Sequence, residues 1–580
     1  MKGENALKGR LFMPKKGYLV AFIFNRLING FFFAGILFCS ALLLVGCDSA
    51  SSKNAMQKQA GRNADKEGHP FVVRISSKDD ITSLDPRLVR DLPSATVIRM
   101  FYEGLMRHDF DGVLVPGVAE KVDVSPDLKT YTFTLRDSTW SNGDPVTAED
   151  FAYAWKSMLD PQFPGPNAYQ LYVIKGAKAA KEGQLPLDMV GIHAKDRSTL
   201  VVELENSTPY FLELVDFHAY FPINSQWAIQ NPGKKIDAQH MLANGPFTLD
   251  KWSHDNVLIA NKNQAYWDAL NVNLDKIEVI IINEATAVQM FKRDALDWIG
   301  SPLSVLPPDS LASLRHEEAL SSTPAAGTHW FRFNTAAKPF DHPKMRQAMT
   351  YALDRHSLVE HVLQGGQIPA MGIIPPSMKA QASAPLFADH QVFAAQQLLK
   401  DALDDMHIKK EQLPPITLAY INNENNHKIA QAVQQQWNKV LGIPVILEGK
   451  EAKVFYDKLN RKDYQIANGS WFADFRDPLN FLEVFKYKDG GTSNTQWENA
   501  QYIELLDLSS KESDPAKRQQ ILHAAEQLLM QELPIAPIFF ANYNFVKKDN
   551  VQGVYFSELG YLDFKHAYID NDALDTWDDE

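Results

Sequence analysis

Apolar and polar residues alternate with a period of two in several short segments of the chain. PFVVRIS (Pro70–Ser76), TYTFTLR (Thr130–Arg136) and STLVVELE (Ser198–Glu205) show this alternation, which is typical of half-buried strands. KIEVIIINE (Lys276–Glu284) is more continuously apolar and predicts a buried strand followed by a helix. The folded part of the chain is therefore expected to begin near residue 70 with β structure.

A helical period of 3.6 residues appears elsewhere. After the turn SNGDP, Thr147 is in a position to cap a helix, with Glu149 and Asp150 in its first turn. The apolar face of this helix follows the i, i+3, i+4, i+7 spacing at Phe151, Ala154, Trp155 and Met158. HPKMRQAMTYALDRHSLVEHVL (His342–Leu363) predicts one long amphipathic helix.

A β-α-β unit is predicted in the second half of the chain. ITLAYI (Ile416–Ile421) is followed by a helix through Lys439 and then by IPVILEGK (Ile443–Lys450). The whole pattern predicts an α/β fold with several mixed sheets. Because no repeat and no glycine-serine linker divides the chain, we expect domains joined by more than one crossing, as in hinged two-lobed proteins.

Length, composition and charge narrow the class of protein. A chain of 580 residues predicts about two to four domains. The composition, 45% hydrophobic and 22% charged, excludes long disorder and a multi-span membrane protein. The net charge of -13 disfavours a nucleic-acid partner, which would require a basic face.

The first 46 residues have the order of a secretory signal. Basic residues precede an almost wholly apolar stretch from Leu19 to Val45, which by length alone would also fit a membrane anchor. The stretch ends in Leu44-Val45-Gly46-Cys47, which resembles a bacterial lipobox with lipid attached to Cys47. We therefore predict a lipoprotein signal peptide at residues 1–46, with translation starting at Met1 or Met13.

Cleavage before Cys47 would change the rest of the chain in two ways. Cys39 would be removed, so that no internal disulfide could form. Losing six basic residues and one acid would bring the net charge to -18.

Residues 47–70 are polar and small, and they predict a flexible tether. Asp48 resembles the inner-membrane retention signal of enteric lipoproteins.

Common catalytic and cofactor patterns are missing from the sequence. HEEAL (His316–Leu320) lacks the second histidine of a HExxH zinc motif. The chain has no GxSxG elbow, no phosphate-binding P-loop, no GxGxxG and no CxxC. We predict no catalytic residue, no metal site and no cofactor.

SWFADFRDP (Ser470–Pro478) combines an acid with several aromatic residues. An ionised Asp474 among Trp471, Phe472 and Phe475 requires a counter-charge if it is enclosed. That charge could come from an internal cation such as Arg476, from a catalytic proton or from the ammonium group of a ligand.

Several segments together resemble the oligopeptide/dipeptide/nickel-binding family of extracytoplasmic solute-binding proteins, which serve ABC importers. The resemblance covers nearly all of the chain after residue 70. It rests on SLDP (83–86), FYEGL (101–105), VPGVAE (115–120), YTFTLR to AYAWK (131–156), ANGPFTL (243–249), AYWD (265–268), MRQAMTYALDR (345–355) and SWFADFRDP.

The resemblance implies a large two-lobed fold that closes over its ligand. The first lobe is expected to have a core domain and an extra subdomain at residues 103–226. Its core domain would comprise residues 71–102, 227–330 and 542–580. The second lobe would comprise residues 331–541. In peptide-binding members the ligand is held as an added β-strand, which gives affinity without reading side chains.

The resemblance also assigns candidate ligand-binding residues. Asp474 of the Trp471-Phe472-Ala473-Asp474 segment would bind the α-ammonium of a peptide, with Ser470 beside it. The peptide backbone would pair near Arg90 to Leu92. The positions at which some members hold the ligand's carboxylate with basic residues fall near Asn468, Arg461 and His427 (or Asn426). Since Asn468 is uncharged, we expect looser selection of peptide length.

These features predict a lipid-anchored, monomeric receptor that captures oligopeptides outside the cytoplasmic membrane and passes them to an ABC permease. It would require no cofactor and perform no chemistry. The alternatives are a binding protein for a cell-wall peptide, glutathione, a metal chelate, haem or an opine and, in other classes, an envelope chaperone or a hydrolase.

Overall fold

The computed structural model describes residues 70–317, 319–379, 384–488 and 493–570. The predicted signal peptide, the tether and Cys47 lie outside the described residues. Within the described ranges, no helix combines the length and the apolar character needed to cross a bilayer.

The fold is mixed α/β and contains one 11-stranded sheet with several smaller sheets. Ten strands of the large sheet follow in the order β15 (Val445–Lys450), β14 (Ile416–Ile421), β16 (Ile466–Phe472), β12 (Ser321–Phe333), β17 (Ile535–Lys547), β11 (Trp298–Gly300), β1 (Val72–Ser77), β10 (Lys276–Ile281), β9 (Val257–Lys262) and β8 (Phe247–Ser253). The short β13 (Ile368–Pro369) pairs with β17 beside this path.

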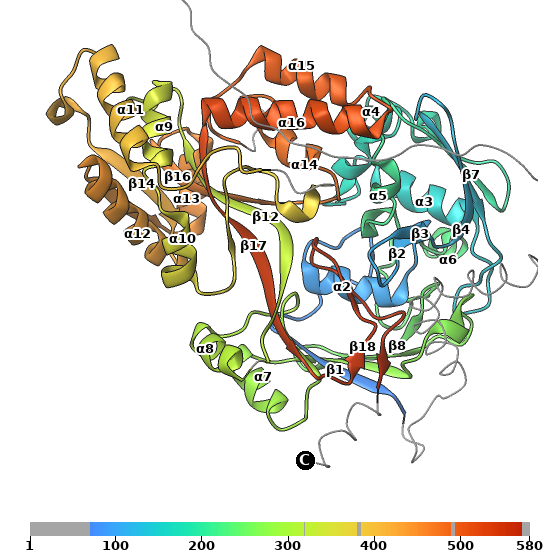
Figure 1. Cartoon of the computed structure of the whole chain (residues 1–580). Helices are drawn as coiled ribbons and strands as arrows, with labels where there is room; N and C mark the ends of the chain where they lie inside the picture. Colours follow the sequence, from blue (N-terminus) through green and yellow to red (C-terminus); the bar gives the residue numbers. More distant parts are fainter. Residues whose placement is uncertain (1–69, 318, 380–383, 489–492, 571–580) are drawn as a thin grey trace, which may run out of the picture. The chain divides into compact units, whose positions relative to one another are not determined.

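Two long antiparallel strands, β12 and β17, join the two halves of this sheet (Figure 1). Each is 13 residues long. At one end β17 pairs with β11, and at the other end β12 pairs with β16. Between Pro324 and Thr328 the register of β12 against β17 shifts. The two halves of the sheet are thus connected by two strands rather than one.

The strands predicted in the first part of the chain are present. β1 pairs in parallel with β10, and their inward residues Val73, Ile75, Ile277 and Val279 are fully buried. The helix predicted after β10 is α7 (Glu284–Phe291). The four buried side chains of β1 and β10 form part of the largest hydrophobic core.

The predicted β-α-β unit is also confirmed. β14 and β15 run parallel, and α12 (Glu424–Leu441) connects them. Asn423 caps the start of α12 by accepting a hydrogen bond from the backbone of Asn426. Gly442 ends it at φ +63°, a left-handed conformation that glycine adopts without a steric penalty.

A separate four-stranded sheet carries the Thr147 helix. Its strands follow in the order β4 (Ala119–Val124), β5 (Thr130–Leu135), β7 (Thr199–Glu203) and β6 (Ile192–Ala194). The predicted helix is α3 (Ala148–Met158), and the Asp150 carboxylate accepts a hydrogen bond from the backbone N–H of Thr147. Trp155 and Met158 of its apolar face are fully buried.

The prediction of one long helix over His342–Leu363 is wrong. The segment forms α9 (Pro343–Tyr351), α10 (Arg355–Leu358) and a π-helical turn, η5 (Val359–Leu363). Asp354 has an extended backbone and caps α10 through the N–H of Ser357, 2.9 Å away. The buried Arg355 binds Asp389 and the carbonyl of Pro537 at 2.9 and 2.7 Å, contacts that local periodicity does not reveal.

The remaining elements surround these sheets. The helices are α2 (Leu92–Phe101), α4 (Ala177–Lys181), α5 (Phe211–Leu214), α6 (Ser225–Gln230), α8 (Pro308–His316), α11 (Val392–Asp405), α13 (Ala452–Asn460), α14 (Leu479–Leu482), α15 (Ala500–Ser509) and α16 (Pro515–Glu532). The short strand pairs are β2 (Met106–His108) with β3 (Leu114–Pro116), β18 (Val551–Gln552) with β21 (Tyr568–Ile569), and β19 (Tyr555–Phe556) with β20 (Leu562–Asp563).

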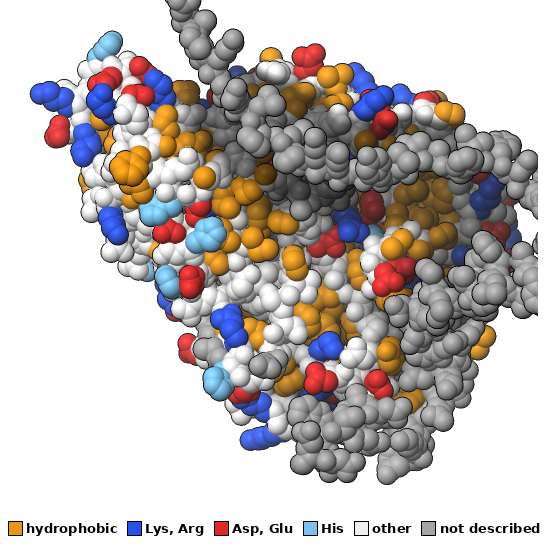
Figure 2. All heavy atoms as spheres, in the orientation of Figure 1, with side chains coloured by type: hydrophobic (Ala, Val, Ile, Leu, Met, Phe, Trp, Pro, Cys, Tyr) orange, Lys and Arg blue, Asp and Glu red, His pale blue; other side chains and the backbone are white. Residues whose placement is uncertain are grey.

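Hydrophobic side chains gather over the region of β12 and β17 on the face shown in Figure 2. Phe472 at the end of β16 and Ile368 on β13 flank these strands and are 43% and 40% exposed. The crossing strands therefore adjoin an exposed apolar surface, of the kind that often marks a binding region.

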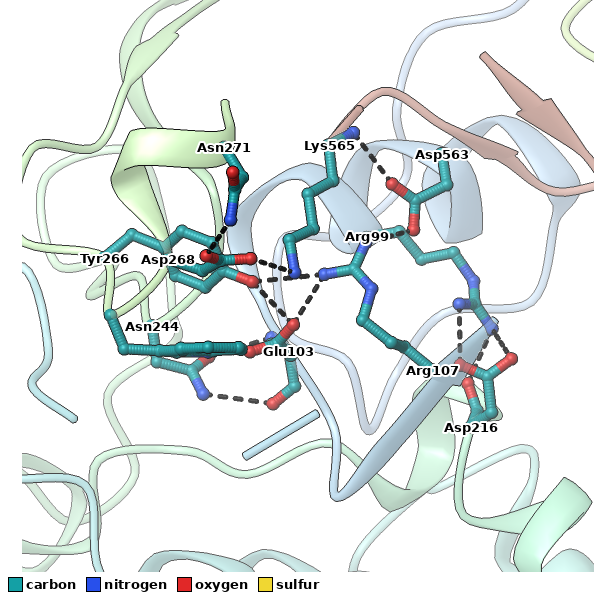
Figure 3. Close-up of polar contacts among 12 residues, drawn as sticks. Arg99, Glu103, Arg107, Asp216, Asn244, Tyr266, Asp268, Asn271, Asp563 and Lys565 are labelled. Atoms are coloured by element: carbon teal, nitrogen blue, oxygen red, sulfur yellow. Dashed lines mark hydrogen bonds and ion pairs between the residues drawn. The ribbon is translucent and has the colours of Figure 1, made fainter. Parts of the chain in front are cut away.

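Three of the sequence segments that indicated the family meet in one buried polar network (Figure 3). Glu103 of FYEGL accepts hydrogen bonds from Tyr266 and Trp267 of AYWD at 2.6 and 2.5 Å. The Glu103 backbone N–H donates to the side chain of Asn244 of ANGPFTL at 3.1 Å. These segments serve the fold, because they all contact one buried residue, Glu103.

The same network fastens the C-terminal segment to β2 and to Asp268. Arg107 donates to Glu103 at 2.5 Å and to Asp563 at 2.6 Å. Lys565 forms an ion pair with Asp268 at 2.8 Å. Residues 563–565 are thus held against a segment more than 450 positions earlier.

Candidate functional site

A cavity of about 230 Å³ has walls from two distant segments of the chain. The first segment supplies residues from the 3-10 helix η1 (Ala168–Val173) and from the start and end of α5. The second comprises the end of β16 and the residues that follow it. The lining residues are Tyr169, Gln170, Val173, Tyr210, Leu214, Trp471, Asp474, Phe475, Asn480, Glu483 and Val484.

The segment after β16 folds so that Asp474 lies at this cavity. The N–H of Ala473 bonds the carbonyl of Ala326 at 2.8 Å, which continues the contact between β16 and β12. Asp477 then accepts a hydrogen bond from the N–H of Leu479, the first residue of α14. The side chain of Asn480 accepts from Trp471 Nε1 at 2.7 Å and from the N–H of Asp474 at 3.2 Å. The turn is therefore tied at both ends.

Asp474 is a half-buried carboxylate with one hydrogen-bond donor from the opposite wall, since the Tyr169 hydroxyl donates to its Oδ2 at 3.3 Å. No Lys, Arg or His among the described residues lies within ion-pair distance of it. Burial raises the pKa of Asp474, while the nearby polar side chains of Tyr169, Gln170 and Asn480 oppose that rise. Its charged form therefore lacks full compensation within the described structure.

The charged residues next to Asp474 in the sequence form ion pairs with other residues. Arg476, the internal cation considered for Asp474, lies 2.7 Å from Glu558 and donates to the carbonyl of Gly112 at 3.0 Å. Asp477 forms a buried bidentate pair with Arg518 at 2.6 and 2.9 Å. Of the acids in SWFADFRDP, Asp477 is neutralised internally, whereas Asp474 lies at the cavity.

Aromatic rings enclose the site. Phe475 stacks on Tyr210 with ring centroids 4.8 Å apart and an interplanar angle of 6°, which brings the two walls together. Burial and the charge of Asp474 raise the pKa of Tyr169 to about 12, so its hydroxyl keeps its proton at neutral pH. Apolar aromatic surface beside a carboxylate lowers the local dielectric and so strengthens its attraction to any nearby cation.

The predicted residues of β16 divide between two faces of the strand. Successive side chains alternate, so Trp471 lines the cavity whereas Ser470 and Phe472 do not. Ser470 pairs with His329, and the ring of Phe472 packs edge-on against that histidine. The structure therefore brings Trp471 and Asp474 together and places the other two residues on the far face.

Arg90 and Leu92 are not part of the cavity wall but lie near it in the fold. Arg90 is exposed, and Leu92 begins α2. The carbonyl of Val89 accepts a hydrogen bond at 2.9 Å from Asn167, which directly precedes the 3-10 helix carrying Tyr169. The segment predicted to pair with a peptide backbone thus adjoins one wall of the cavity.

The residues at the predicted carboxylate-binding positions lie outside the cavity wall. Asn468 on β16 accepts a long, 3.4 Å hydrogen bond from the N–H of Ile421. His427 on α12 is 2.6 Å from the hydroxyl of Tyr420, and Arg461 is an exposed residue at the end of α13. Their role in binding stays a prediction.

Sequence reasoning missed much of the cavity. Tyr169, Gln170 and Tyr210 precede Asp474 by 264 to 305 positions and carry no recognisable local motif. Asn480 lies six residues from Asp474 and could have been considered as a support for it. Glu483 looks like an ordinary surface acid in the sequence and is exposed in the structure, yet it lines the cavity.

Metal binding finds no support in the described part of the chain, where no three His, Cys, Asp or Glu side chains gather as ligands. The arrangement offers instead a carboxylate, aromatic walls and two further polar side chains, Gln170 and Asn480. Chemically, such an arrangement is suited to a positively charged group.

Comparison with known proteins identifies the family. Residues 113–493 match the family model described as bacterial extracellular solute-binding proteins, family 5 middle. The oligopeptide-binding protein OppA of Bacillus subtilis is 44% identical over 504 residues, which cover 86% of this chain and 92% of OppA.

Solved structures are similar over the same extent. The unliganded open form of MppA, a periplasmic murein tripeptide-binding protein, has a TM-score of 0.76 at 29% identity, covering 86% of this chain and 97% of MppA. Haemophilus influenzae OppA in complex with the peptide RPPGFSPFR has a TM-score of 0.68 at 26% identity, covering 86% and 99%. The fold is accordingly the two-lobed fold of periplasmic peptide-binding proteins. The chain belongs to family 5 of the bacterial extracellular solute-binding proteins.

Proposed function

We propose that this protein captures oligopeptides outside the cytoplasmic membrane and delivers them to an ABC permease. The observation that carries the proposal is Asp474, a carboxylate at an aromatic cavity that has no cationic partner among the described residues. A peptide supplies the missing charge through its α-ammonium group. The names of the Bacillus and Haemophilus relatives support a peptide as the ligand.

In this proposal each wall of the cavity has a separate task. Asp474 binds the ammonium, while Tyr169 and Asn480 hold the carboxylate in place. Trp471 and Phe475 keep water from the pair, so that its attraction is less screened. The rest of the peptide extends past the Arg90–Leu92 segment as an added strand, which contributes affinity through backbone hydrogen bonds.

The remaining features follow the sequence predictions. A lipid on Cys47 holds the monomeric protein at the membrane, and residues 47–70 allow it to reach the permease. Residues 71–102, 227–330 and 542–580 form the first lobe together with the subdomain 103–226, and residues 331–541 form the second. Without a basic residue at Asn468, the protein accepts peptides of varied length and requires no cofactor.

A cell-wall peptide is the second candidate ligand, and the similarity to MppA supports it. Such a ligand would also bring a free amine to Asp474. Mass spectrometry of small molecules released from the denatured purified protein distinguishes it from ordinary oligopeptides by its mass.

Calorimetric titration with tetra-alanine and with N-acetyl-tetra-alanine tests the role of Asp474. Replacing Asp474 by Ala leaves the ligand ammonium buried without its counter-charge, which costs about 3–5 kcal/mol, or roughly two to three and a half decades in affinity. We expect the acetylated peptide to bind weakly to both proteins. Asp457→Ala removes an exposed carboxylate on α13 and serves as the matched control. Unchanged affinity of Asp474→Ala for tetra-alanine would contradict the proposal.

A further inference from the structure

A second carboxylate, Glu483, lines the same cavity as Asp474. It lies on the 3-10 turn η8 (Glu483–Phe485), which directly follows α14, and its side chain is accessible to solvent. No Lys, Arg or His in the described ranges lies within ion-pair distance of Glu483. The cavity therefore holds two acids, whereas a single α-ammonium compensates only one.

The cations nearest to Glu483 are already paired with other acids. Lys486 lies 2.7 Å from Asp507, and Arg518 forms its bidentate pair with Asp477. Glu483 therefore has no cation of its own at ion-pair distance, although solvent reaches its side chain.

An independent feature of the wall also indicates a ligand. Gln170 is only 5% exposed, and its Nε2 forms no hydrogen bond with any described residue. A buried amide donor without an acceptor is costly and rare, so a ligand acceptor is expected to satisfy it. The carbonyl of a peptide's first residue is such an acceptor, and it lies three bonds from the α-ammonium nitrogen.

The cavity has room and suitable walls for a charged side chain. Its volume of about 230 Å³ far exceeds the roughly 10–15 Å³ that one water molecule requires on the same kind of measure. Tyr169, Tyr210 and Trp471 supply aromatic surface, which attracts cations and also packs against the methylene groups of lysine or arginine.

From these observations we infer that Glu483 makes the cavity select peptides whose first residue carries a cationic side chain. The inference rests on the proposed function. Asp474 receives the α-ammonium, Glu483 receives the side-chain cation, and Gln170 donates to the first carbonyl. A lysine or arginine at the first position compensates both acids, whereas a neutral residue leaves Glu483 without a partner.

Three peptides of equal length test the inference by calorimetric titration. They are Lys-Ala-Ala-Ala, norleucine-Ala-Ala-Ala, in which the first side chain has similar length but no charge, and Ala-Lys-Ala-Ala, in which the charge moves to the second position. We expect the wild-type protein to bind the first peptide about five- to tenfold more tightly than the second. The third peptide should also bind more tightly than the second, but its gain in binding free energy should be less than half of that of the first.

Glu483→Gln should abolish the preference by weakening only the peptide with lysine at the first position. Glu504→Gln removes an exposed acid from the nearby helix α15 and should retain the full preference. Equal affinity of the wild-type protein for the lysine and norleucine peptides would overturn the inference and leave the proposed function intact. A preference that persists in Glu483→Gln would overturn it too.

The wild-type comparison requires no variant, so the inference can be tested even if Glu483→Gln folds poorly. Failure of all three peptides to bind the wild-type protein would overturn the proposed function, and this inference with it. The two failures are therefore distinguishable in one set of titrations.

Discussion

Two groups of carboxylates in this protein lie in crowded surroundings, and they differ in what neutralises them. In the network around α2, Glu103 is bound by Arg107, Tyr266 and Trp267. At the cavity, Asp474 and Glu483 have no ion-pair partner in the described part of the chain. Both groups include segments through which the sequence resembles the family, FYEGL and SWFADFRDP. Only in the first group do basic side chains of the protein itself neutralise the acid.

Asp216 shows the contrast through its pKa. It is 5% exposed, and Arg99 and His108 each approach it to 2.9 Å. Despite desolvation, the charge and hydrogen bonds of these residues lower its pKa to about 2. Burial instead raises the pKa of Asp474. The two shifts differ because Asp216 has two basic side chains at ion-pair distance, whereas Asp474 has none among the described residues.

Breaking the internal network should have the largest effect on stability. Glu103→Ala leaves Arg107 buried with Asp563 as its remaining partner and removes the acceptor of Tyr266 and Trp267. We expect a loss of about 3–5 kcal/mol in the free energy of unfolding, measured by urea denaturation. If Glu103→Ala lowers the free energy of unfolding by less than about 1 kcal/mol, the acids of the network contribute no more to stability than those of the cavity.

His108 should make stability depend on pH at the other end of the network. Although desolvation opposes it, contact with Asp216 and Glu213 raises the pKa of His108 to about 9, from 6.5 when unfolded. Its contribution is therefore fully present below pH 6.5 and is lost as pH rises through 9, amounting to at most about 3 kcal/mol. Urea midpoints should fall more steeply over this window in the wild-type protein than in His108→Gln.

Arg476 should matter much less than its position beside Asp474 suggests. Its ion pair with Glu558 is partly exposed, so Arg476→Gln should reduce the free energy of unfolding by less than about 1 kcal/mol. Tetra-alanine affinity should change by less than about threefold, since Asp474 does not depend on Arg476. A hundredfold loss of affinity would instead indicate that the two residues act together.

Asp474 itself should contribute nothing favourable to the stability of the ligand-free protein. Because burial raises its pKa, ionised Asp474 opposes folding once the pH exceeds its pKa in the unfolded chain. We expect Asp474→Asn to equal or slightly exceed the wild-type free energy of unfolding at pH 7, measured after removal of bound ligand. If Asp474→Asn were destabilised as much as Glu103→Ala, the acids of the cavity would not differ from those of the network in their contribution to stability.

Local patterns in the sequence were sufficient for several elements and for one site residue. The alternation in Thr130–Arg136 and the capping pattern at Thr147 both correspond to observed elements, because neighbouring residues dominate their formation. Asp474 was identifiable because a lone acid among aromatics conflicts with burial. The His342–Leu363 prediction failed where Arg355 binds Asp389 and Pro537, 34 and 182 positions away.

The sequence by itself determined the class of fold, the family and an acid in need of a cation. Only the tertiary structure decided which cations form ion pairs with other acids, since Arg476 pairs with Glu558 rather than with Asp474. It also brought Tyr169 to Asp474 across 305 positions and placed Glu483 and Gln170 in the same cavity. The physical reason is that periodicity reflects local backbone preferences, whereas compensation of a charge depends on whatever the fold brings within a few ångströms.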